Sequence, residues 1–312
     1  MEESGRVYSV IIPVYNEEEV LETTWKRLTE TMRSVDGAYE LLFVDDGSKD
    51  ATPGILRRIC ERDPCSKMIS FSRNFGQQAA MSAGIDYSRG KAVVFIDADL
   101  QDPPEVIPRM IEKWKEGYDI VYGKRLKRKG ETAFKKITAA VFYRLLRAMA
   151  DEEIPVDAGD FRLIDGKVRD LLKGLREKNR YLRGMVSWAG FKQAAVEYDR
   201  EERFAGETKY PLRSMIRLAL TAFTNFSKPL RLATWTGFAL SAFSFLQILV
   251  VVYEKLFTDR AVQGWASLMA VSLFFNGVIL MMLGLVGEYL ARLLDEVKDR
   301  PVYVVAEKRN VE

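Results

Sequence analysis

The chain contains no histidine and only two cysteines among its 312 residues. Histidine is the side chain whose ordinary pKa lies closest to neutral pH, so a general base in this protein must come chiefly from Asp, Glu, Cys or Lys. The two cysteines, Cys60 and Cys65, lie in the stretch CERDPC. A C-x4-C pair without further Cys or His cannot complete a zinc site, so these residues indicate reduced thiols in a cytosolic domain.

The signals of three common function classes are also missing. The chain has 47 basic and 44 acidic residues, so it lacks the basic excess of a nucleic-acid-binding protein. No G-x-G-x-x-G follows the first apolar segment and no P-loop lysine motif occurs, which argues against a dehydrogenase or a P-loop enzyme. The N-terminal MEESGRVYSV has acidic residues where a signal peptide carries basic ones, so no secretory signal is expected.

Long hydrophobic runs are present only in the C-terminal third. Residues 232–253 and 261–287 carry no charge, and each run exceeds the roughly 20 residues that cross a bilayer as a helix. The loop between them is short and neutral, whereas basic residues lie on both outer sides: Arg213, Arg217, Lys228, Arg231, Arg292, Lys298 and Arg300. The positive-inside rule then places both termini in the cytoplasm. A helical hairpin buried in a soluble core is the alternative.

Short apolar segments alternate with helical patterns in the first 230 residues. Strands are predicted at 7–14, 40–45, 67–71, 92–97 and 118–123, and helices at 17–34, 52–62, 76–88 and 103–116. Near-continuous apolar strands that alternate with helices predict an α/β fold with a doubly wound, mostly parallel sheet. Ligands of such sheets bind beyond the carboxyl ends of the strands, so the residues that follow each strand form the candidate site.

The fourth predicted strand runs into the acidic stretch DADLQDPPE. Asp97 and Asp99 should point to the same side of the strand, with Ala98 pointing away. Two neighbouring carboxylates repel unless a cation lies between them or one is protonated, and oxygen ligands of this kind suit Mg²⁺ or Mn²⁺ that also binds a diphosphate. Two solvated loop acids are the alternative. Asp102, which precedes Pro-Pro-Glu, is predicted to cap the helix that follows.

A second acidic pair, Asp45 and Asp46 in DDGS, ends the second predicted strand. Because adjacent residues on a strand point in opposite directions, at most one of the two acids faces the site directly. A carboxylate at this position can accept hydrogen bonds from a ribose or a base. The pair therefore adds a candidate nucleotide contact to the candidate metal site.

The stretches PVYNEE, VDDGSKDAT and DADLQDPPE, in this order, resemble the glycosyltransferase family 2 catalytic domain, which has the GT-A fold. LQDPPE, DAGDFRLID, RFAGETKYP and the two apolar runs narrow the resemblance to the polyisoprenyl-phosphate glycosyltransferases. These include the bactoprenol glucosyltransferases and the dolichol-phosphate mannose synthase-like enzymes. The resemblance covers essentially the whole chain. The Q-x-x-R-W motif of processive polysaccharide synthases is absent, which argues against a chain-elongating relative.

The resemblance implies roles for particular residues. It assigns Pro13, Tyr15, Glu17 and Asp46 to the nucleotide, and Asp97, Asp99 and Gln101 to a divalent metal and the diphosphate. Asp160 matches the catalytic acid beside the acceptor, with Asp157 as the second choice. The basic residues Arg125, Arg203 and Lys209 match phosphate-binding positions, and solvated surface charge is the alternative for each.

The reaction implied by the resemblance is the inverting, metal-dependent transfer of one sugar to a polyisoprenyl phosphate such as undecaprenyl phosphate. The favoured donor is UDP-glucose, and the expected cofactor is Mg²⁺ or Mn²⁺. The second pKa of a phosphomonoester is about 6, so the acceptor is already largely a dianion at neutral pH. Asp160 then either orients the acceptor, balances positive charge on the sugar or removes a proton. GDP-mannose or another donor, a non-catalytic nucleotide-sugar-binding module and a transporter are the alternatives.

Resemblance and hydropathy together predict four parts. Residues 1–210 form the GT-A domain, 211–230 an interfacial amphipathic segment, 231–292 two transmembrane helices and 293–312 a cytoplasmic tail. The enzyme is expected at the inner (plasma) membrane of the cell, with its catalytic domain and both termini in the cytoplasm. Gly277, Gly284 and Gly287 allow close approach between hairpins, which predicts a homo-oligomer.

Overall fold

The computed structural model describes residues 8–125, 158–175, 177–178, 180–199 and 264–311, with Leu246, Tyr253 and Phe257 as isolated residues between them. The chain divides into two compact units. One unit comprises Met1–Ala148, Glu152–Ala222 and Pro301–Glu312, and the other comprises Met149–Asp151 and Phe223–Arg300. The first unit is called the catalytic unit below, and each unit is described by itself.

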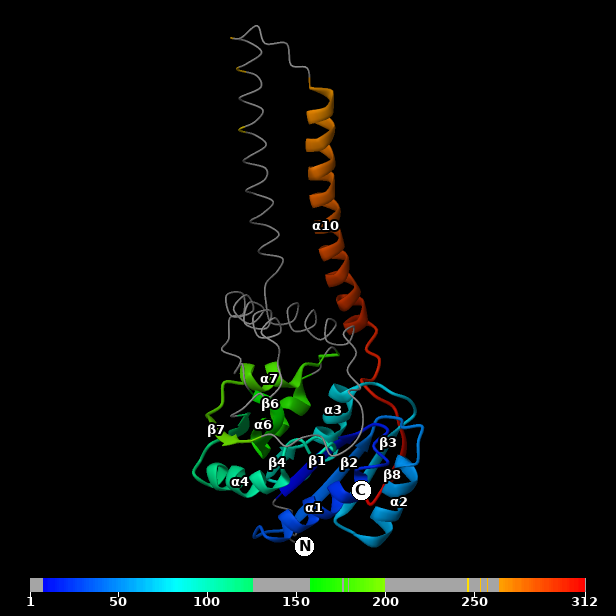
Figure 1. Ribbon diagram of the computed structural model, residues 1–312, viewed down its shortest axis with the longest axis vertical. Helices are drawn as coiled ribbons and strands as arrows, with labels where there is room; N and C mark the ends of the chain where they lie inside the picture. The colour runs from blue at the N-terminus through cyan, green and yellow to red at the C-terminus, as the bar shows by residue number, and fades with distance from the viewer. Residues whose placement is uncertain are drawn as a thin grey trace. The chain divides into compact units, whose positions relative to one another are not determined.

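An eight-stranded mixed sheet forms the centre of the catalytic unit (Figure 1). Its strands are β1 (Tyr8–Val14), β2 (Tyr39–Asp45), β3 (Ser66–Phe71), β4 (Ala92–Phe95), β5 (Ile120–Arg125), β6 (Ala158–Asp165), β7 (Gln193–Tyr198) and β8 (Val305–Arg309). They lie in the order β7-β5-β6-β4-β1-β2-β3-β8. The central β3-β2-β1-β4 block is parallel, β6 runs antiparallel to both β4 and β5, and β8 runs antiparallel to β3. The α/β architecture predicted from the sequence is therefore confirmed, with β6, β7 and β8 as strands that the sequence did not reveal.

Helices cover both faces of this sheet. They are α1 (Leu21–Arg33), α2 (Thr52–Arg62), α3 (Gln77–Tyr87), the 3-10 turn η1 (Pro104–Val106), α4 (Ile107–Lys115), α6 (Gly166–Gly174) and α7 (Leu182–Trp188). Helix α1 contacts α2 and α4, whereas α3 contacts β1, β2 and α6, and α6 contacts α7. The predicted helices at 52–62 and 76–88 match α2 and α3 closely. The apolar residues of α2 recur at the helical period, whereas α3 is buried over the consecutive residues 79–85.

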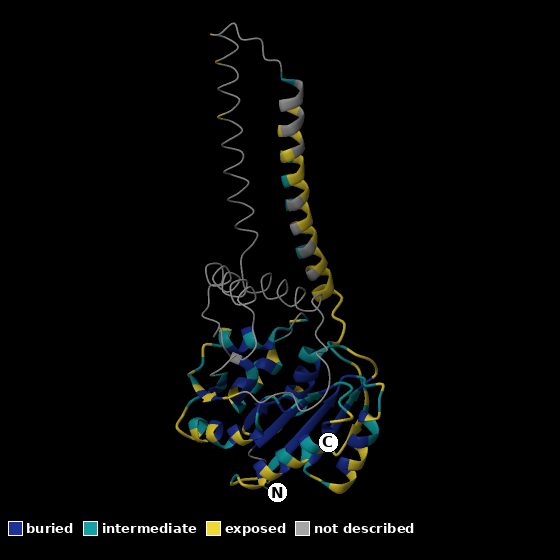
Figure 2. Ribbon diagram, in the orientation of Figure 1, coloured by how far each residue is buried: buried dark blue, intermediate teal, exposed yellow. Residues whose placement is uncertain are grey.

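The core lies between the sheet and these helices (Figure 2). Val10, Ile12 and Val14 alternate along β1 and are buried in one cluster with Leu28 of α1. Ile11 is also fully buried, and a Cβ at Gly84 of α3 would lie only 2.2 Å from its Cγ2 atom. Glycine at position 84 thus lets α3 approach the sheet closely, which explains why this helix carries so many small residues.

Ser9, Glu40 and Lys67 form a buried polar cluster near the amino ends of β1, β2 and β3, called the amino-end cluster below. Lys67 Nζ lies 2.7 Å from Glu40 Oε2, and the two side chains are 3% and 0% exposed. Ser9 Oγ donates to Glu40 Oε1 at 2.5 Å, and the backbone N–H of Arg89 donates to the same oxygen at 2.9 Å. Burial raises the pKa of Glu40, but the hydrogen bonds from Lys67, Ser9 and Arg89 outweigh it and lower the pKa below its ordinary value.

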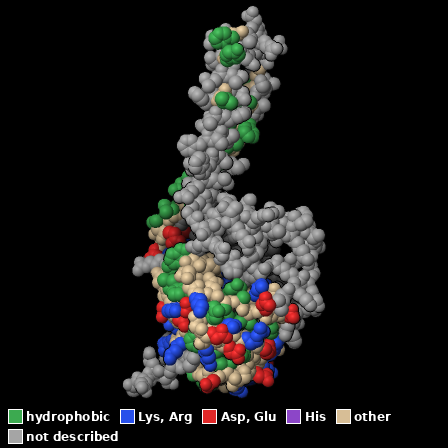
Figure 3. All heavy atoms as spheres, turned by 90° about the vertical axis from the view of Figure 1, so that its left-hand side faces the viewer, with side chains coloured by type: hydrophobic (Ala, Val, Ile, Leu, Met, Phe, Trp, Pro, Cys, Tyr) green, Lys and Arg blue, Asp and Glu red, His purple; other side chains and the backbone are tan. Residues whose placement is uncertain are grey.

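The second unit contains one described helix, α10 (Trp265–Val297), of 33 residues. Its part Phe274–Val297 is long and apolar enough to cross a membrane, and Phe274, Ile279 and Leu283 are among its exposed side chains. In Figure 3 the coloured side chains of this unit are mainly hydrophobic, whereas the surface of the catalytic unit carries mixed acidic and basic side chains. The predicted span 232–253 and the predicted interfacial segment 211–230 lie outside the described residues, apart from Leu246 and Tyr253.

The chain re-enters the catalytic unit after α10. Only residues 298–304 separate the end of that helix from β8, which pairs with β3 at the edge of the sheet. The sequence predicted a tail over 293–312 and no strand there. Charged residues such as Glu307, Lys308 and Arg309 are typical of edge strands, which carry charges to prevent pairing with other chains.

Candidate active site

Asp97 and Asp99 follow β4 at the carboxyl edge of the parallel block, as predicted. Ala98 between them is 3% exposed and belongs to the core, and its carbonyl oxygen accepts a hydrogen bond from Thr24 Oγ1 of α1 at 2.7 Å. The two carboxylates lie close enough for the charge of Asp99 to contribute to the raised pKa of Asp97. Asp99 Oδ1 also accepts the backbone N–H of Gln101 at 3.1 Å, which folds the chain into a tight turn.

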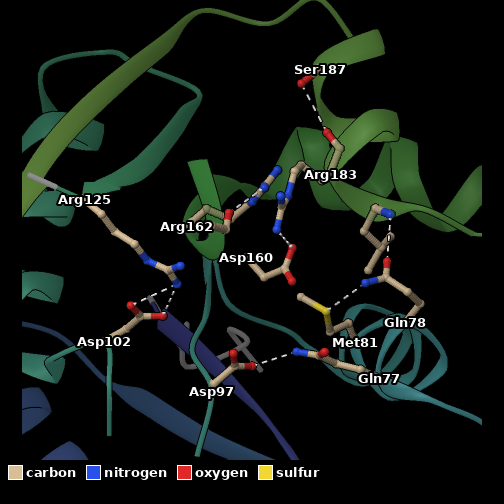
Figure 4. Close-up of polar contacts among 12 residues, drawn as sticks. Gln77, Gln78, Met81, Asp97, Asp102, Arg125, Asp160, Arg162, Arg183 and Ser187 are labelled. Carbon is tan, nitrogen blue, oxygen red and sulfur yellow. Dashed lines mark hydrogen bonds and ion pairs between the residues drawn. The ribbon is translucent and has the colours of Figure 1, made fainter. Parts of the chain in front are cut away.

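A third acid, Asp160 of β6, lies beside this pair. Phe95 and Arg162 form the last pair between β4 and β6, and Asp97 and Asp160 each lie two residues beyond it, close enough for the charge of Asp160 to affect the pKa of Asp97. Burial and the negative charges of Asp160, Asp99 and Asp102 raise the pKa of Asp97 to about 7. Gln77 Nε2, from the first residue of α3, donates to Asp97 Oδ1 at 2.8 Å (Figure 4). Asp97, Asp99 and Asp160 are called the carboxyl-edge cluster below.

Asp102 is not the helix cap that the sequence predicted. Pro103 precedes the turn η1, without a side-chain cap, and the Asp102 carboxylate is instead buried at 2% exposure. It accepts a short hydrogen bond from Tyr198 Oη and lies 3.3 Å from an Arg125 nitrogen. Burial alone would lower the pKa of Arg125, but Asp102 and Tyr198 raise it above its ordinary value. The capping prediction was wrong because the partners of Asp102 come from β5 and β7.

Three arginine side chains lie near Asp160 or the neighbouring residue Gly159. Arg183 of α7 extends toward Asp160, with its Nη2 atom 3.1 Å from Asp160 Oδ1 (Figure 4). Arg162 is 5% exposed and donates to the Gly159 carbonyl oxygen at 2.9 Å. Burial lowers the pKa of Arg162 to about 10, opposed by Asp160 and reinforced by Arg183. Arg125 lies close as well, because a Cβ at Gly159 would come within 3.0 Å of its Nη2 atom.

Asp46, at the end of β2, holds the β3–α3 loop (Ser72–Gly76). Its carboxylate accepts the backbone N–H groups of Phe75 at 2.6 Å and of Gly76 at 2.9 Å. Burial raises the pKa of Asp46 to about 6 against the effect of these two hydrogen bonds. Asp45 has a different role, because its carboxylate accepts the backbone N–H of Ser48 in the turn and the hydroxyl of Ser70 on β3. The prediction that the two acids point differently thus agrees with their separate partners.

The loop after β1 is joined to the loop after β2 by reciprocal hydrogen bonds. The backbone N–H of Asn16 donates to Ser48 Oγ at 2.8 Å, and Lys49 N–H donates to Asn16 Oδ1 at 2.9 Å. Glu17 N–H donates to Thr52 Oγ1 at 2.9 Å. These bonds stabilise Asn16 at a φ of 52° and hold the loop at the edge where Asp46 lies. The three predicted nucleotide contacts in this region, Pro13 near the end of β1 and Tyr15 and Glu17 in the loop, are all partly exposed.

The comparisons with known proteins identify the family. Residues 9–172, more than half of the chain, match Glycosyl transferase family 2. The chain belongs to this family. Residues 228–293 match the GtrB C-terminal hairpin, across both apolar runs that the sequence predicted as membrane spans. The resemblance inferred from the motifs is confirmed, and the protein is a glycosyltransferase.

Relatives of this glycosyltransferase match it over nearly its full length. It is 57% identical to the uncharacterized glycosyltransferase YkcC of Bacillus subtilis, across 98% of this chain and 95% of that protein. It is 40% identical to the bactoprenol glucosyl transferase of Shigella phage SfII, across 95% of this chain and 96% of that protein. The solved mannosyl-3-phosphoglycerate synthase from Rubrobacter xylanophilus shares the fold, with a TM-score of 0.50, 17% identity, and coverage of 70% of this chain and 72% of that one.

The site of this glycosyltransferase contains residues that the sequence did not single out. Arg183, Gln77 and Tyr198 each bind a predicted acid, yet none of them lies in a stretch that carried the resemblance. Their partners are between 20 and 96 positions away, so no local pattern could reveal them. Three predicted residues, Asp157, Arg203 and Lys209, lie outside the described part of the chain.

The residues at the carboxyl edge fit a divalent metal with substrate oxygens. No three Asp, Glu or Cys side chains of the described residues form a complete metal site. Mg²⁺, however, is usually bound by one or two carboxylates together with substrate phosphates and water. Burial, and after it the negative charges of Asp160, Asp99 and Asp102, raise the pKa of Asp97, and a cation at this position would favour the ionised carboxylate. Asp97 and Asp99 would hold such an ion, and Gln101, whose backbone N–H binds Asp99, is the further residue that the resemblance implies there.

Proposed function

We propose that this glycosyltransferase transfers a single glucose from UDP-glucose to a polyisoprenyl phosphate, and that the transfer requires Mg²⁺ or Mn²⁺. The observation that carries the proposal is the carboxyl-edge cluster, with Asp160 beside the Asp97–Asp99 pair and Arg183 against Asp160. The named bactoprenol glucosyl transferases, which match across nearly the whole chain, support the choice of sugar and acceptor.

The donor would bind along the carboxyl edge of the parallel block. Asp46, Pro13, Tyr15 and Glu17 are assigned to the nucleotide, and Asp97, Asp99 and Gln101 to the metal that holds the diphosphate. When bound, a divalent cation stabilises the negative charge of the departing nucleoside diphosphate, so no acid is needed to protonate it. The absence of histidine from the chain agrees with a reaction that needs no proton donor of that kind.

The acceptor phosphate would bind on the arginine side of the cluster. A phosphomonoester is largely a dianion at neutral pH, so its oxygen needs orientation more than deprotonation. Arg125 and Arg183 offer planar guanidinium groups, which suit phosphate oxygens. Asp160 is already bound to Arg183 at 3.1 Å, so it holds that guanidinium in place. We assign Asp160 to orientation of the acceptor and to charge balance at the sugar, and assign phosphate binding to Arg125, Arg203 and Lys209.

A lipid acceptor requires the reaction to occur at a membrane surface. The hairpin match over residues 228–293 and the apolar helix segment Phe274–Val297 support attachment to the membrane. We propose that residues 231–292 form two membrane-spanning helices, with the interfacial segment 211–230 before them and the catalytic unit in the cytoplasm. Association of hairpins into a homo-oligomer belongs to the same proposal.

The decisive experiment is a donor screen with the purified full-length protein in lipid vesicles that contain undecaprenyl phosphate. UDP-glucose, UDP-GlcNAc, UDP-galactose and GDP-mannose are each supplied with Mg²⁺ or Mn²⁺, and the lipid products are identified by mass. We expect one hexose per lipid, from UDP-glucose, and no product with EDTA. A preference for GDP-mannose would correct the donor, and several sugars per lipid or no lipid product at all would contradict the proposed reaction.

A further inference from the structure

The segment after α10 reaches into the part of the catalytic unit that surrounds Asp46. Tyr303 lies six positions after Val297, the last residue of α10. Its ring stacks on Phe71 of β3, with centroids 5.0 Å apart and planes 12° apart. Its hydroxyl donates to Asp86 Oδ2 of α3 at 2.7 Å. Tyr303 therefore joins the last residue of β3 to α3, the two elements between which the β3–α3 loop runs.

The next residue of this segment binds the loop itself. The carbonyl oxygen of Val304 accepts the backbone N–H of Ser72 at 3.0 Å. This hydrogen bond extends the pairing of β3 and β8 past the irregular register at Ser70 and Phe71. The loop thus starts from a position that Tyr303 and Val304 determine together.

The loop transmits this contact to Asp46 within four residues. Phe71 meets Phe75 edge to face at 5.8 Å, and the Arg73 guanidinium lies 4.0 Å from the centre of the Phe75 ring. The N–H groups of Phe75 and Gly76 then bind the Asp46 carboxylate. The loop backbone also passes directly over the next turn, because a Cβ at Gly47 would lie 2.4 Å from the Arg73 carbonyl carbon. A shift of the loop would therefore move both Asp46 and the turn that follows it.

We propose that Tyr303 is a positioning residue for the nucleotide site, through which the segment that follows α10 holds the β3–α3 loop in its binding conformation. The inference rests on the proposed assignment of Asp46 to the nucleotide. It gives the C-terminal segment a role in donor binding beyond covering the edge of the sheet. The consequence is that a change confined to this segment alters donor affinity without touching any residue of the carboxyl-edge cluster.

The same segment offers a matched control. Arg57 of α2 forms an ion pair with Glu307 of β8 at 2.7 Å, on solvent-exposed side chains. Neither residue contacts Ser72–Gly76 in any described interaction. Loss of the Arg57 side chain therefore weakens the attachment of β8 while leaving the path from Tyr303 to Asp46 intact. If the segment contributes only to stability, changes at Tyr303 and at Arg57 should affect donor affinity equally. If Tyr303 positions the loop, only the change at Tyr303 should weaken donor binding.

The test compares Tyr303→Ala, Tyr303→Phe and Arg57→Ala in the full-length protein. Binding of UDP-glucose is measured by calorimetry, steady-state kinetics give kcat and both KM values, and amide exchange reports on Phe75 and Gly76. For Tyr303→Ala we expect donor Kd and donor KM to rise by about 2- to 30-fold, the range typical of coupling through packed side chains. The kcat at saturating donor and the acceptor KM should stay unchanged, because only donor binding is weakened.

The three variants should rank in a definite order. Tyr303→Phe keeps the stacked ring and should lie close to the wild type, and Arg57→Ala should leave donor affinity and loop exchange unchanged. Faster amide hydrogen exchange at Phe75 and Gly76 in Tyr303→Ala, but not in the other two variants, would support the inference. This measurement does not depend on enzyme activity. Equal donor affinities in Tyr303→Ala and Arg57→Ala would overturn it, as would a parallel rise of both KM values. If Tyr303→Ala does not fold, Tyr303→Leu replaces it in the same comparison.

Failure of the proposed function gives a different result. If the wild-type protein glycosylates no lipid phosphate but binds UDP-glucose, the acceptor assignment fails and the Tyr303 comparison still stands on the binding data. If Asp46→Ala leaves UDP-glucose affinity unchanged while Tyr303→Ala weakens it, the role of Asp46 is wrong and the role of Tyr303 is retained.

Discussion

Buried carboxyl groups at the two ends of the central sheet have pKa values shifted in opposite directions. At the amino ends, Glu40 is paired with Lys67 and hydrogen-bonded by Ser9, and its pKa lies below the ordinary value. At the carboxyl ends, burial and the neighbouring acids Asp160 and Asp99 raise the pKa of Asp97 to about 7. A carboxylate paired with a buried cation contributes to a single stable fold, whereas a buried carboxylate beside other acids is ionised more readily when a cation binds there. The contrast distinguishes a structural cluster from a binding site by physical chemistry alone.

The first prediction breaks the amino-end cluster. Lys67→Met should leave the Glu40 carboxylate buried without its cation, which typically costs about 3–5 kcal/mol of folding free energy. Urea unfolding of the detergent-solubilised full chain measures the loss. Because the cluster lies at the opposite end of the strands from the candidate site, both KM values of the folded fraction should stay unchanged. The double variant Lys67→Met with Glu40→Gln should recover part of the stability, since no unpaired charge remains.

The exposed pair of Arg27 and Glu105 provides the control for this first prediction. Its side chains are 28% and 56% exposed, and such pairs contribute only about 0–1 kcal/mol. Arg27→Met should therefore shift the urea midpoint far less than Lys67→Met. Similar losses in the two variants would remove the claim that the amino-end cluster is a special stabilising feature.

The second prediction breaks the carboxyl-edge cluster. Asp99→Ala should lower turnover by more than about 100-fold, because even the loss of an outer partner of a metal ligand typically costs 10–100-fold. Stability without metal should not fall, since the change relieves repulsion with Asp97. Transfer assays with Mg²⁺ and unfolding in EDTA test the two halves. Glu105→Gln, an exposed acid a few residues along the same chain stretch, should keep full activity. Full activity of Asp99→Ala would contradict the assignment of the metal.

The contrast between the two ends also explains how much the sequence could predict. The strand–helix alternation and the DAD stretch are local patterns, so the parallel block was predicted correctly and Asp97 and Asp99 follow β4 as expected. Their role as metal ligands stays a prediction. Lys67 and Glu40 come together only when β2 and β3 pair, and each alone looks like an ordinary surface charge. Hydropathy and charge therefore carry no sign of the amino-end cluster.

Errors arose where a local signal competed with distant partners. Asp102 precedes two prolines and a glutamate, which favours a helix cap, but Tyr198 and Arg125 bind its carboxylate instead. The motif that contains Asp160 was recognised, yet its strand β6 was not, because an antiparallel strand inserted between β4 and β5 leaves no mark in the order of elements. The charged pattern of β8 was taken for a tail for the same reason: its partner β3 lies more than two hundred residues earlier.

The third prediction concerns Asp160, which belongs to the carboxyl-edge cluster and also pairs with Arg183. Asp160→Asn keeps the shape of the side chain but removes the charge that binds Arg183. If Asp160 orients the acceptor, kcat should fall by about 10- to 100-fold and a measurable rate should remain. Loss of an essential general base would lower kcat further. The pH profile should follow the second ionisation of the acceptor near 6. Loss of nearly all turnover that persists at high pH would make Asp160 an obligatory base.

Arg183→Gln provides the matched comparison for the third prediction. Both variants disrupt the same 3.1 Å ion pair, so a shared orienting role predicts losses of similar size and non-additive effects in the double variant. A much smaller loss in Arg183→Gln would indicate that the Asp160 carboxylate acts on the substrates directly.

The last and smallest effect concerns the pKa of Asp46, which burial raises to about 6. The folded state then holds a proton more tightly than the unfolded state, so the contribution of Asp46 to stability is present at low pH and is lost as the pH rises through 6. Donor binding should change in the opposite direction. In the ionised form, each oxygen of the Asp46 carboxylate accepts one backbone N–H, from Phe75 or from Gly76. Protonation places a hydrogen on one of these oxygens and weakens its hydrogen bond, so the β3–α3 loop is held less firmly.

The affinity for UDP-glucose, measured by calorimetry without metal, should therefore fall by up to about tenfold between pH 7 and pH 5, as one ionisation near 6. Both phosphates of this donor stay ionised across that range, and omission of metal removes competition between protons and cations at Asp97. Asp46→Asn should reduce the pH dependence of binding and of unfolding together, while Asp97, whose pKa is raised to about 7, keeps its own share of the unfolding slope. Glu105→Gln should preserve both. If donor affinity rose as the pH fell, Asp46 would bind in its protonated form, and the loop would then have to be held by Tyr303 and Val304 alone.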